Sequence, residues 1–509
     1  MKNLKNYVEA QSKVETVNAE GCIAYKKSDE ELLDQLAMTG TLTDTFYATA
    51  NELADDALEL LDRAAPEAIA KAIVKGRQEG FIRTFPILGL VKLSSKSSEL
   101  FKQVFSEVVL TGNDLGDFLD LCRKMRGLGR AVKSAISTWL DKNVNPYYAQ
   151  KYCRQIADAV RLCRYRGEDP IFGYILAGKD VHGWTAEKME AAYAKYPELA
   201  AHREFLEKVE SGDLKGACEI LKHNRLDVDS LTAVYNKFDA ELWYEIAAQT
   251  PIMRFLKYLS KFNCEGVFNT AKGLNLMQTK IYVNSLLHAK VFPFRLYSAY
   301  RAVPYVSGVS DRLADVLDEY TTTYDWGGFN DYSWAICPDV SGSMSSNIGN
   351  GEMTYQDISG MFVGFFHKGL NDVLVFPWDT EVHDFPVSSE ASVLEHIEKL
   401  HSLCGGGTAM SCALKLMTEH KIHRDRFIFI TDSEEYSNPF CAGVIDPWFS
   451  AWQEYRKEVN PKAEAFLIRI DPYGTNPFPE GAAREHGIHQ IYGWNDNVVR
   501  YIEYTLSLK

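Results

Sequence analysis

The sequence lacks any long apolar run. No uncharged stretch reaches about 18 apolar residues, the length that a membrane-spanning helix needs. The first segment, MKNLKNYVEAQSK, has neither the apolar core nor the cleavage pattern of a secretion signal. With 46% hydrophobic and 24% charged residues, the composition is that of an ordinary globular protein. We therefore expect no membrane partner and a cytoplasmic location.

Motifs of zinc sites and disulfide frameworks are also missing. The ten cysteines are scattered along the chain, and none of them forms a Cys-x-x-Cys pair. Large domains without a secretion signal seldom depend on disulfides, because their apolar core is sufficient. We predict buried free thiols.

Recognisable catalytic motifs are absent as well. The chain contains neither the phosphate-binding pattern Gly-x-x-x-x-Gly-Lys-Ser/Thr nor a Gly-x-Ser-x-Gly nucleophile elbow. The pair Glu434–Glu435 is better interpreted as a polar loop, and the pair His420/His423 as the end of a helix. We therefore expect a protein that is not an enzyme.

Positive charge is scarce in the C-terminal third. From Phe329 to Lys509 there are 13 Lys and Arg residues against 25 Asp and Glu residues, a balance of −12. The other residues, 1–328, carry the remaining 42 basic and 44 acidic residues, a balance of −2. The N-terminal part can therefore carry basic patches that the net charge of −14 hides.

Residues 1–300 follow the pattern of successive amphipathic helices. Apolar residues recur at spacings of three and four, as in Leu32, Leu33 and Leu36, and turn residues such as Asn145-Pro146 separate the segments. We find no strand pattern here and no repeat with a fixed motif. Helix pairs stacked as a HEAT-like solenoid fit this pattern, because such repeats are often degenerate.

The pattern changes near residue 325. The polar, Gly-rich segment 321–328 is a plausible linker, and short apolar runs alternating with helical patterns follow it. Strands that alternate with helices are typical of a parallel, doubly wound α/β domain. The predicted strands are Trp334–Cys337, Val373–Phe376, Phe427–Ile430 and Ala465–Ile470, and the predicted helices are Asp357–His367, Val393–Leu400 and Cys412–Glu419.

Oxygen-bearing side chains follow or precede three of these elements. Asp339, Ser341 and Ser343 come after the first strand, Thr408 follows a run of three glycines, and Asp432 follows the third strand. Ligands of open α/β sheets bind where the carboxyl ends of the strands meet. Carboxylates and hydroxyls are ligands for Mg²⁺, a hard cation that also keeps several waters. The sequence therefore predicts a site for Mg²⁺ or another divalent cation, with an open position for an acidic group of a partner.

The order Asp-x-Ser-x-Ser, then Thr, then Asp resembles the metal-ion-dependent adhesion site of von Willebrand factor A domains over residues 329–509. Pro338 departs from that family, which usually has an ordinary apolar strand residue there. Because proline cannot donate a ladder hydrogen bond, we expect the first strand to end or bulge at this residue.

Three segments of the helical part resemble the TROVE module of the Ro autoantigen family. They are KMRGLGRAVKSAISTWL at 124–140, TPIMRFLKYLSK at 250–261 and AKVFPFRL at 289–296. The resemblance spans roughly residues 30–509. It implies a multidomain fold in which an all-α HEAT-like repeat ring, residues 1–325, is closed by the A domain, residues 329–509. It also implies a ribonucleoprotein component, which binds small noncoding RNA or single-stranded 3′ ends of structured RNA and is not an enzyme.

The charge pattern gives separate support for RNA binding. Between Arg123 and Arg166 there are 11 basic residues and only two acidic ones. Arg126, Arg130 and Lys133 have the spacing of one helix face, and such aligned charge suits a phosphate backbone. Four tyrosines in the same stretch are candidates for stacking on bases, although tyrosines at helical spacing usually lie in a core. The candidate RNA-binding residues are Lys124, Arg126, Arg130, Lys133, Arg154, Arg161, Arg164 and Arg166.

Two points stay open at this stage. Glu168-Asp169-Pro170 replaces a Gly-Trp-Ser-His run of the Ro family, so the resemblance carries over to RNA binding in general more than to Y RNA recognition. The alternative function is that of an adhesion or scaffold protein, whose A domain binds an acidic residue of a protein partner through the metal. Basic residues that gather on one surface favour RNA, whereas dispersed or ion-paired ones favour the scaffold. A ring closed by one chain predicts a monomer.

Overall fold

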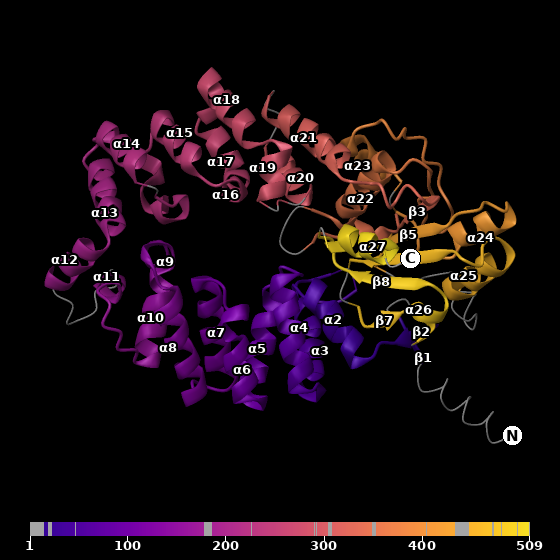
Figure 1. The fold of residues 1–509 in the computed structure, drawn as a ribbon, viewed down its shortest axis with the longest axis horizontal. Coiled ribbons are helices and arrows are strands. Elements are labelled where there is room, and N and C mark those ends of the chain that lie inside the picture. Colours follow the sequence, from indigo (N-terminus) through magenta and orange to yellow (C-terminus); the bar gives the residue numbers. More distant parts are fainter. Residues whose placement is uncertain are drawn as a thin grey trace. The chain divides into compact units, whose positions relative to one another are not determined.

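The computed structural model describes most of the chain (Figure 1). The described residues are 15–18, 23–45, 47–177, 186–224, 226–289, 291, 293–303, 308–348, 353–403, 405–432, 447–470, 473–479, 481–495 and 497–507. Within these ranges no helix is long and apolar enough to cross a membrane. Glu434 and Glu435 lie outside them, as do Cys22, Cys404 and Cys441.

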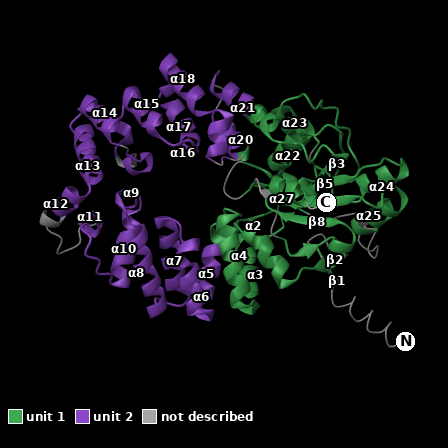
Figure 2. Cartoon of the chain, in the orientation of Figure 1, with its two compact units in different colours: residues 1–85, 292–294, 317–509 green, residues 86–291, 295–316 purple. Residues whose placement is uncertain are grey.

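The chain forms two compact units, which are coloured separately in Figure 2. Unit 1 contains residues 1–85, 292–294 and 317–509, and unit 2 contains residues 86–291 and 295–316. The change from helices to an α/β pattern near residue 325 therefore does not coincide with the boundary between compact units, because the first 85 residues belong with the C-terminal third.

The central element of unit 1 is a five-stranded parallel sheet with the strand order β4-β3-β5-β6-β8. Crossover connections by helices place every strand in the same direction. The four strands predicted from the sequence are present, and β8 was not predicted. The strands are β3 (Trp334–Pro338), β4 (Val373–Val375), β5 (Arg426–Thr431), β6 (Glu464–Arg469) and β8 (Ile488–Tyr492).

Helices cover both faces of this sheet, as expected of a doubly wound domain. On one face Phe427 and Phe429 pack in a core with Met417 of α24 and Trp452 of α25. On the other face Trp334 stacks on Phe466, in a layer shared with α22 and α27. The helices of this part are α22 (Tyr355–Gly369), α23 (Val393–His401), α24 (Cys412–Glu419), α25 (Pro447–Glu458), α26 (Ala482–Glu485) and α27 (Asn497–Ser507).

The expectation of no strand in the first 300 residues is wrong. β1 (Glu15–Val17) and β2 (Ile23–Lys26) form an antiparallel pair, and β2 also pairs with β7 (Thr475–Asn476). These strands are three, four and two residues long, which is too short for an alternating pattern to stand out in the sequence. They join the beginning of the chain to the α/β domain.

Three N-terminal helices complete unit 1. They are α2 (Asp29–Thr39), α3 (Ala50–Arg63) and α4 (Pro66–Gln78). Helix α2 packs against β8, where Gly493 at φ 90° brings the backbone against Met38. Two hydrogen bonds also join the N-terminal segment to the C-terminal part of unit 1. Lys27 Nζ donates to the Tyr473 carbonyl at 2.8 Å, and Asn495 Nδ2 donates to the Glu79 carbonyl at 3.0 Å.

The segment 321–328 is packed and is not a flexible linker. α21 (Val309–Thr323) extends into it, and the Trp326 ring lies between Phe365 and Phe329. Trp326 Nε1 donates to the Thr321 carbonyl at 3.0 Å. Gly369 leaves room for this indole, since a Cβ atom there would lie 2.0 Å from Trp326 Cε2. Polar and glycine residues predicted a loop here, but the tryptophan determines the packing.

Unit 2 consists of short helices that pack on their neighbours in the chain, as predicted for helical repeats. Local signals define the ends of several helices. Thr111, for example, forms a capping box with Asp114 at the start of α7, and Trp139 of α8 donates to the Val109 carbonyl at 2.7 Å. The helices are α5 (Thr84–Lys96), α6 (Ser98–Val108), α7 (Gly112–Met125), α8 (Arg130–Asn143), α9 (Pro146–Lys151), α10 (Cys153–Cys163), α11 (Ile171–Ala177), α12 (Ala186–Lys195), α13 (Pro197–Glu210), α14 (Leu214–His223), η1 (Val228–Lys237), α15 (Ala240–Gln249), α16 (Ile252–Lys257), α17 (Leu259–Cys264), η2 (Val267–Asn269), α18 (Ala271–Lys280), α19 (Val283–His288) and α20 (Pro293–Ala302).

The seven described cysteines are free thiols, in agreement with the sequence prediction. Cys264 is exposed, so burial does not extend to all of them. Burial raises the pKa of the Cys122 thiol to about 12, which keeps it protonated and unreactive.

A histidine pair, of which His396 is buried and His367 half-buried, joins α22 to α23. His396 Nδ1 lies 2.8 Å from the Ser392 carbonyl, so this nitrogen carries the proton and donates. His396 Nε2 therefore accepts from His367 Nδ1 at 2.9 Å. Burial, together with neighbouring His396 and Lys368, lowers the pKa of His367 to about 4, and burial also lowers the pKa of His396. Both imidazoles are neutral in the folded chain near neutral pH.

Acidification should therefore weaken the stabilisation that this histidine pair gives to unit 1. Unfolding returns the pKa of both histidines toward 6.5. Between about pH 6.5 and the lower pKa values of the folded chain, the unfolded chain therefore binds more protons than the folded chain. The contribution of the histidine pair to the free energy of unfolding should shrink as the pH drops from about 7.5 to 5, and urea titrations of the wild type and of His367→Gln measure it as their difference. The loss should be smaller in His367→Gln than in the wild type, and the exposed His420→Gln should behave like the wild type. An equal loss in all three chains would contradict the assignment.

Candidate metal centre and basic surface

Four of the predicted metal ligands follow the carboxyl ends of β3 and β5, and the fifth, Thr408, lies in the loop between α23 and α24. The β3 strand ends at Pro338, as predicted, and the loop that follows keeps its place in the sheet. The Pro338 carbonyl accepts from Trp378 N at 3.0 Å, and Asp339 N donates to the Ile430 carbonyl at 3.0 Å. The missing proline N–H falls on the side of β4, which ends at Val375. Proline therefore ends the strand without displacing the metal loop.

The five predicted ligands are all buried, with at most 3% of their surface exposed. One Asp339 oxygen accepts from Ser341 N at 2.8 Å, and the other accepts from Thr431 Oγ1 at 2.6 Å. The hydroxyls of Ser341 and Ser343 lie 3.2 Å apart. The loop Asp339–Ser343 thus turns a carboxylate and two hydroxyls into one small region, as the spacing predicted.

The glycine run brings the second loop against the first. Gly342 N donates to the Gly406 carbonyl at 2.9 Å, and Gly405 N donates to the Val340 carbonyl at 3.0 Å. Position 406 admits only glycine in this arrangement, because a Cβ atom there would lie 2.0 Å from Asp379 Oδ2. These contacts bring the segment that contains Thr408 to the Asp339 loop.

Sequence reasoning missed Asp379, which follows β4. Its carboxylate is buried, lies 2.8 Å from His383 Nε2 and accepts from Glu381 N at 3.1 Å. The Asp379 carbonyl accepts from Ala409 N at 2.7 Å, next to Thr408. The signal was present in the sequence, since Asp379 is an acidic residue that comes soon after a predicted strand, as Asp339 and Asp432 do.

The electrostatics of these residues suit a cation. Burial and the neighbouring Asp432 raise the pKa of Asp339, because two carboxylates lie close together away from water. A bound divalent ion would remove this repulsion. Among the described residues no cluster of three or more His, Cys, Asp and Glu side chains gathers, so such an ion would depend on the serine and threonine hydroxyls. The donor set of two carboxylates and three hydroxyls fits Mg²⁺.

The predicted basic residues gather around three helices of unit 2. Arg123 of α7 and Arg161 of α10 line one groove of about 330 Å³, so the C-terminal parts of these helices lie together. Lys133 of α8 lies close enough to Cys163, at the end of α10, to influence its thiol. The ends of α7 and α10 and the beginning of α8 are therefore neighbours, and these segments and the residues that follow α10 carry Lys124, Arg126, Arg130, Lys133, Arg161, Arg164 and Arg166. We call these seven residues the basic cluster.

Most of the basic cluster is exposed and free of acidic partners. Among the described residues Arg161 alone makes an ion pair in this cluster, with Asp158 at 3.9 Å. Lys133 is half-buried, and the other six residues are exposed. Arg154, at the beginning of α10, is also exposed but lies away from these helix ends. Exposed cations without acidic partners favour RNA over the scaffold alternative.

The prediction that Arg126, Arg130 and Lys133 share one helix face is wrong. Arg126 caps the end of α7, and the chain turns at Gly127, with φ 80°, before α8 begins at Arg130. Arg126 Nη1 donates to the carbonyl of Ser94 at 2.6 Å and to its hydroxyl at 2.5 Å. This arginine therefore joins α7 to α5 as well as adding charge to the surface.

The tyrosines of this stretch are mainly structural. Tyr152 is buried, and the hydroxyl of Tyr148 donates to the Leu110 carbonyl at 2.7 Å. Tyr165 bonds Asp141, and the Tyr147 hydroxyl accepts from Lys151 at 3.0 Å. Three of the four rings are thus held in the helical packing, and Tyr147 borders a pocket described below.

Comparison with known proteins assigns the C-terminal part. Residues 334–503 match the family described as the Ro60 vWA domain. The C-terminal domain is a Ro60-type von Willebrand factor A domain. The Ro-type A domain thus begins at β3 and extends into α27, the span over which the sequence had indicated this resemblance.

The fold of the whole chain also has a relative among solved structures. It matches the crystal structure of the RO (RSR) protein of Deinococcus radiodurans with a TM-score of 0.64 and 16% sequence identity. The match covers 94% of this chain and 99% of that chain. The order of a helical part followed by a Ro-type A domain is therefore confirmed, and with it the resemblance to the Ro family.

Proposed function

We propose that this chain is an RNA-binding protein of the Ro type. It binds small noncoding RNA, or the single-stranded 3′ ends of structured RNA, through the basic cluster, and it holds Mg²⁺ in its A domain. One observation supports the proposal: three neighbouring helix ends carry seven basic residues, and only Arg161 is paired with an acid among the described residues. We further propose that it acts as a monomer in the cytoplasm.

The competing explanation of this cluster is helix stabilisation. Lys124, Arg161 and Arg164 lie at the ends of α7 and α10, where a cation interacts favourably with the helix dipole. That effect needs about one cation for each helix end, and it does not account for Arg130 at the beginning of α8, where a cation is unfavourable. Arg130 and the number of exposed cations therefore favour a polyanionic ligand.

The A domain supplies the metal site of the proposal. Asp339, Ser341, Ser343, Thr408 and Asp432 would hold the ion, and Asp379 would support the loop that contains Thr408. A bound Mg²⁺ supplies positive charge, which compensates the two carboxylates, and can accept an acidic group from a protein partner. We propose that this contact between the metal and a protein partner can coexist with RNA binding, because the basic cluster and the metal ligands lie in different compact units.

The test is a salt-dependent titration of the whole protein with a structured RNA that carries a single-stranded 3′ tail. We expect tight binding that weakens as salt increases, with a log–log slope set by the number of phosphates contacted. Changing Lys124, Arg130, Arg164 and Arg166 to Ala should weaken binding roughly 100-fold or more and reduce the slope by about three to four units. Arg126 is left unchanged because it joins α7 to α5.

The control changes four exposed basic residues of unit 1 to Ala: Lys71, Lys457, Arg484 and Arg500. It alters the net charge by the same amount and should bind like the wild type. Equal losses in both variants would mean that overall charge governs binding and that the basic cluster has no special role. If no chain binds RNA at low salt, metal-dependent binding of a protein partner becomes the leading function.

A further inference from the structure

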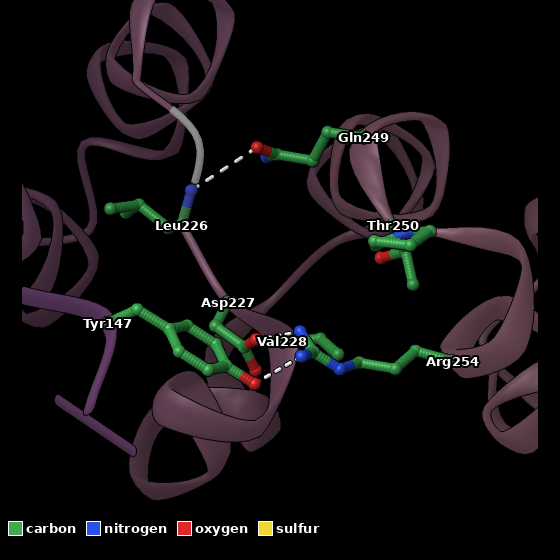
Figure 3. A pocket seen from close by; sticks show the side chains of 8 residues that line it. Tyr147, Leu226, Asp227, Val228, Gln249, Thr250 and Arg254 are labelled. Atoms are coloured by element: carbon green, nitrogen blue, oxygen red, sulfur yellow. Dashed lines mark hydrogen bonds and ion pairs between the residues drawn. The ribbon is translucent and has the colours of Figure 1, made fainter. Parts of the chain in front are cut away.

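Unit 2 contains a pocket of about 300 Å³ that lies apart from the basic cluster (Figure 3). This volume is at the lower end of the range of small-ligand sites. The pocket is bordered by the segment before η1, by the end of α15, by the start of α16 and by one residue of α9. Its lining residues are Tyr147, Leu226, Asp227, Val228, Gln249, Thr250, Pro251 and Arg254.

One side of the pocket is a fixed network of charges. Arg254 donates one terminal nitrogen to Asp227 and the other to the Tyr147 hydroxyl, and Figure 3 shows its side chain reaching toward both. The buried Asp227 carboxylate also accepts from Asp229 N at 2.8 Å. Lys151 donates to the same Tyr147 hydroxyl at 3.0 Å. Each terminal nitrogen of Arg254 thus already has one partner, and the carboxylate of Asp227 lies beside them.

A phosphate is a poor ligand for this side of the pocket. It would meet the Asp227 carboxylate at close range, and it would compete with that carboxylate for the positive charge of Arg254. A neutral ligand with polar edges avoids both costs, because it can lie against the paired network without disturbing it.

Gln249 supplies an unused donor. Its Oε1 accepts from Leu226 N at 3.3 Å across the pocket, as Figure 3 shows. Its Nε2 is buried and has no hydrogen-bond partner among the described residues. A buried amide N–H₂ without a partner is unfavourable, so a ligand that offers an acceptor gains from meeting it.

The remaining walls are apolar, and the surroundings are positive. Leu226, Val228 and Pro251 face the space between the polar groups. Lys280 Nζ donates to the Thr250 carbonyl at 2.7 Å, and Lys257 lies 3.4 Å from Asp229. Including these two lysines, four cations surround the pocket against two carboxylates. Apolar walls, one free donor and a positive border suit a flat polar ring carried on an anionic chain.

We propose that this pocket receives one unpaired nucleobase of a bound RNA strand. Gln249 Nε2 donates to an acceptor on the base edge, Leu226, Val228 and Pro251 contact its faces, and Lys257 and Lys280 attract the neighbouring phosphates. This inference rests on the proposed function, and it adds a site that reads a base, distinct from the basic cluster, which contacts phosphates.

The experiment uses Gln249→Glu, which keeps the acceptor for Leu226 N and replaces the free donor with an acceptor. The matched control is Gln278→Glu, at an exposed glutamine of α18 in the same unit. The ligand is a structured RNA with a uridine tail, compared with the same RNA whose tail is abasic. We expect the abasic tail to weaken wild-type binding about tenfold. Gln249→Glu should lose a similar factor relative to Gln278→Glu, and it should bind the two RNAs almost equally.

A second readout locates the base directly. A tail containing 4-thiouridine should crosslink, on irradiation, to residues 226–228 or 249–254 of the wild-type protein. Equal binding of the uridine and abasic tails by the wild type, or crosslinks confined to other segments, would overturn the base pocket. Competition by inorganic phosphate but not by uridine would overturn it as well. If neither RNA binds any of the chains, the proposed function itself has failed, which is a different result.

Discussion

Replacing Asp432 by Asn should abolish the stabilisation of the protein by Mg²⁺ and should make the metal-free protein more stable. In the metal-free state burial, and then the repulsion between Asp432 and Asp339, raises the pKa of Asp339. Removing one charge relieves this repulsion by about 0.5–3 kcal/mol, the range of interaction energies between neighbouring residues. The same change removes a ligand, so the metal can no longer stabilise the fold.

The measurement is thermal unfolding with a chelator and with Mg²⁺. A metal at 100 times its Kd raises the free energy of unfolding by about 2.7 kcal/mol. The wild type and Asp384→Asn, which changes an exposed aspartate of the same domain, should both gain from Mg²⁺. Asp432→Asn should gain nothing and should start from a higher melting temperature. A wild type that ignores Mg²⁺, Mn²⁺ and Ca²⁺ alike would refute the metal site.

A chain that begins at Phe329 should fail to form a stable A domain. This truncation removes α2 from β8 and removes β2 from β7. The apolar side chains that it deletes include Tyr25, Leu33 and Leu36, which are buried in unit 1, and each buried side chain of this size contributes about 1.5–3 kcal/mol. Together these losses reach the whole stability of an ordinary domain, about 5–15 kcal/mol.

Far-UV circular dichroism and urea titration test this expectation. Residues 329–509 alone should unfold at low urea or aggregate, because β7 and β8 lose the partners that cover them. Residues 317–509 produced together with residues 1–85 as a separate chain should regain a cooperative transition. If residues 329–509 unfold at the same urea concentration as the whole protein, the N-terminal segment is dispensable for the A domain.

The metal loops could be predicted from the sequence because each lies next to a strand with a continuous apolar run. Trp334–Cys337 and Phe427–Ile430 are central strands, buried on both faces, and the first polar residues after such strands must lie at the edge of the sheet. Asp339 and Asp432 could therefore be placed together without knowing how the helices pack. Asp379 follows β4, a strand that is only partly buried, and its weaker apolar pattern gave less reason to inspect the residue beyond it.

Features that depend on distant contacts could not be predicted in this way. The pairing of Tyr25 with Asn476 joins residues far apart in the chain, and no local pattern carries that information. The break between α7 and α8 was missed because Arg126, Arg130 and Lys133 fit a helical spacing. Gly127 and Gly129 between them were the signal for a turn, and the regular charge spacing concealed it.

The grouping of residues 1–85 with residues 317–509 has a consequence for synthesis on the ribosome. When α2, α3 and α4 have emerged, the surface that they pack against has not yet been made. At about 5–20 residues per second, the intervening residues 86–316 take roughly 10–50 s to translate. During that time the apolar sides of the first helices have no permanent partner, whereas unit 2 can already form from contacts between neighbours. The nascent chain thus completes its middle before its beginning, and its first helices are a natural place for a chaperone to act.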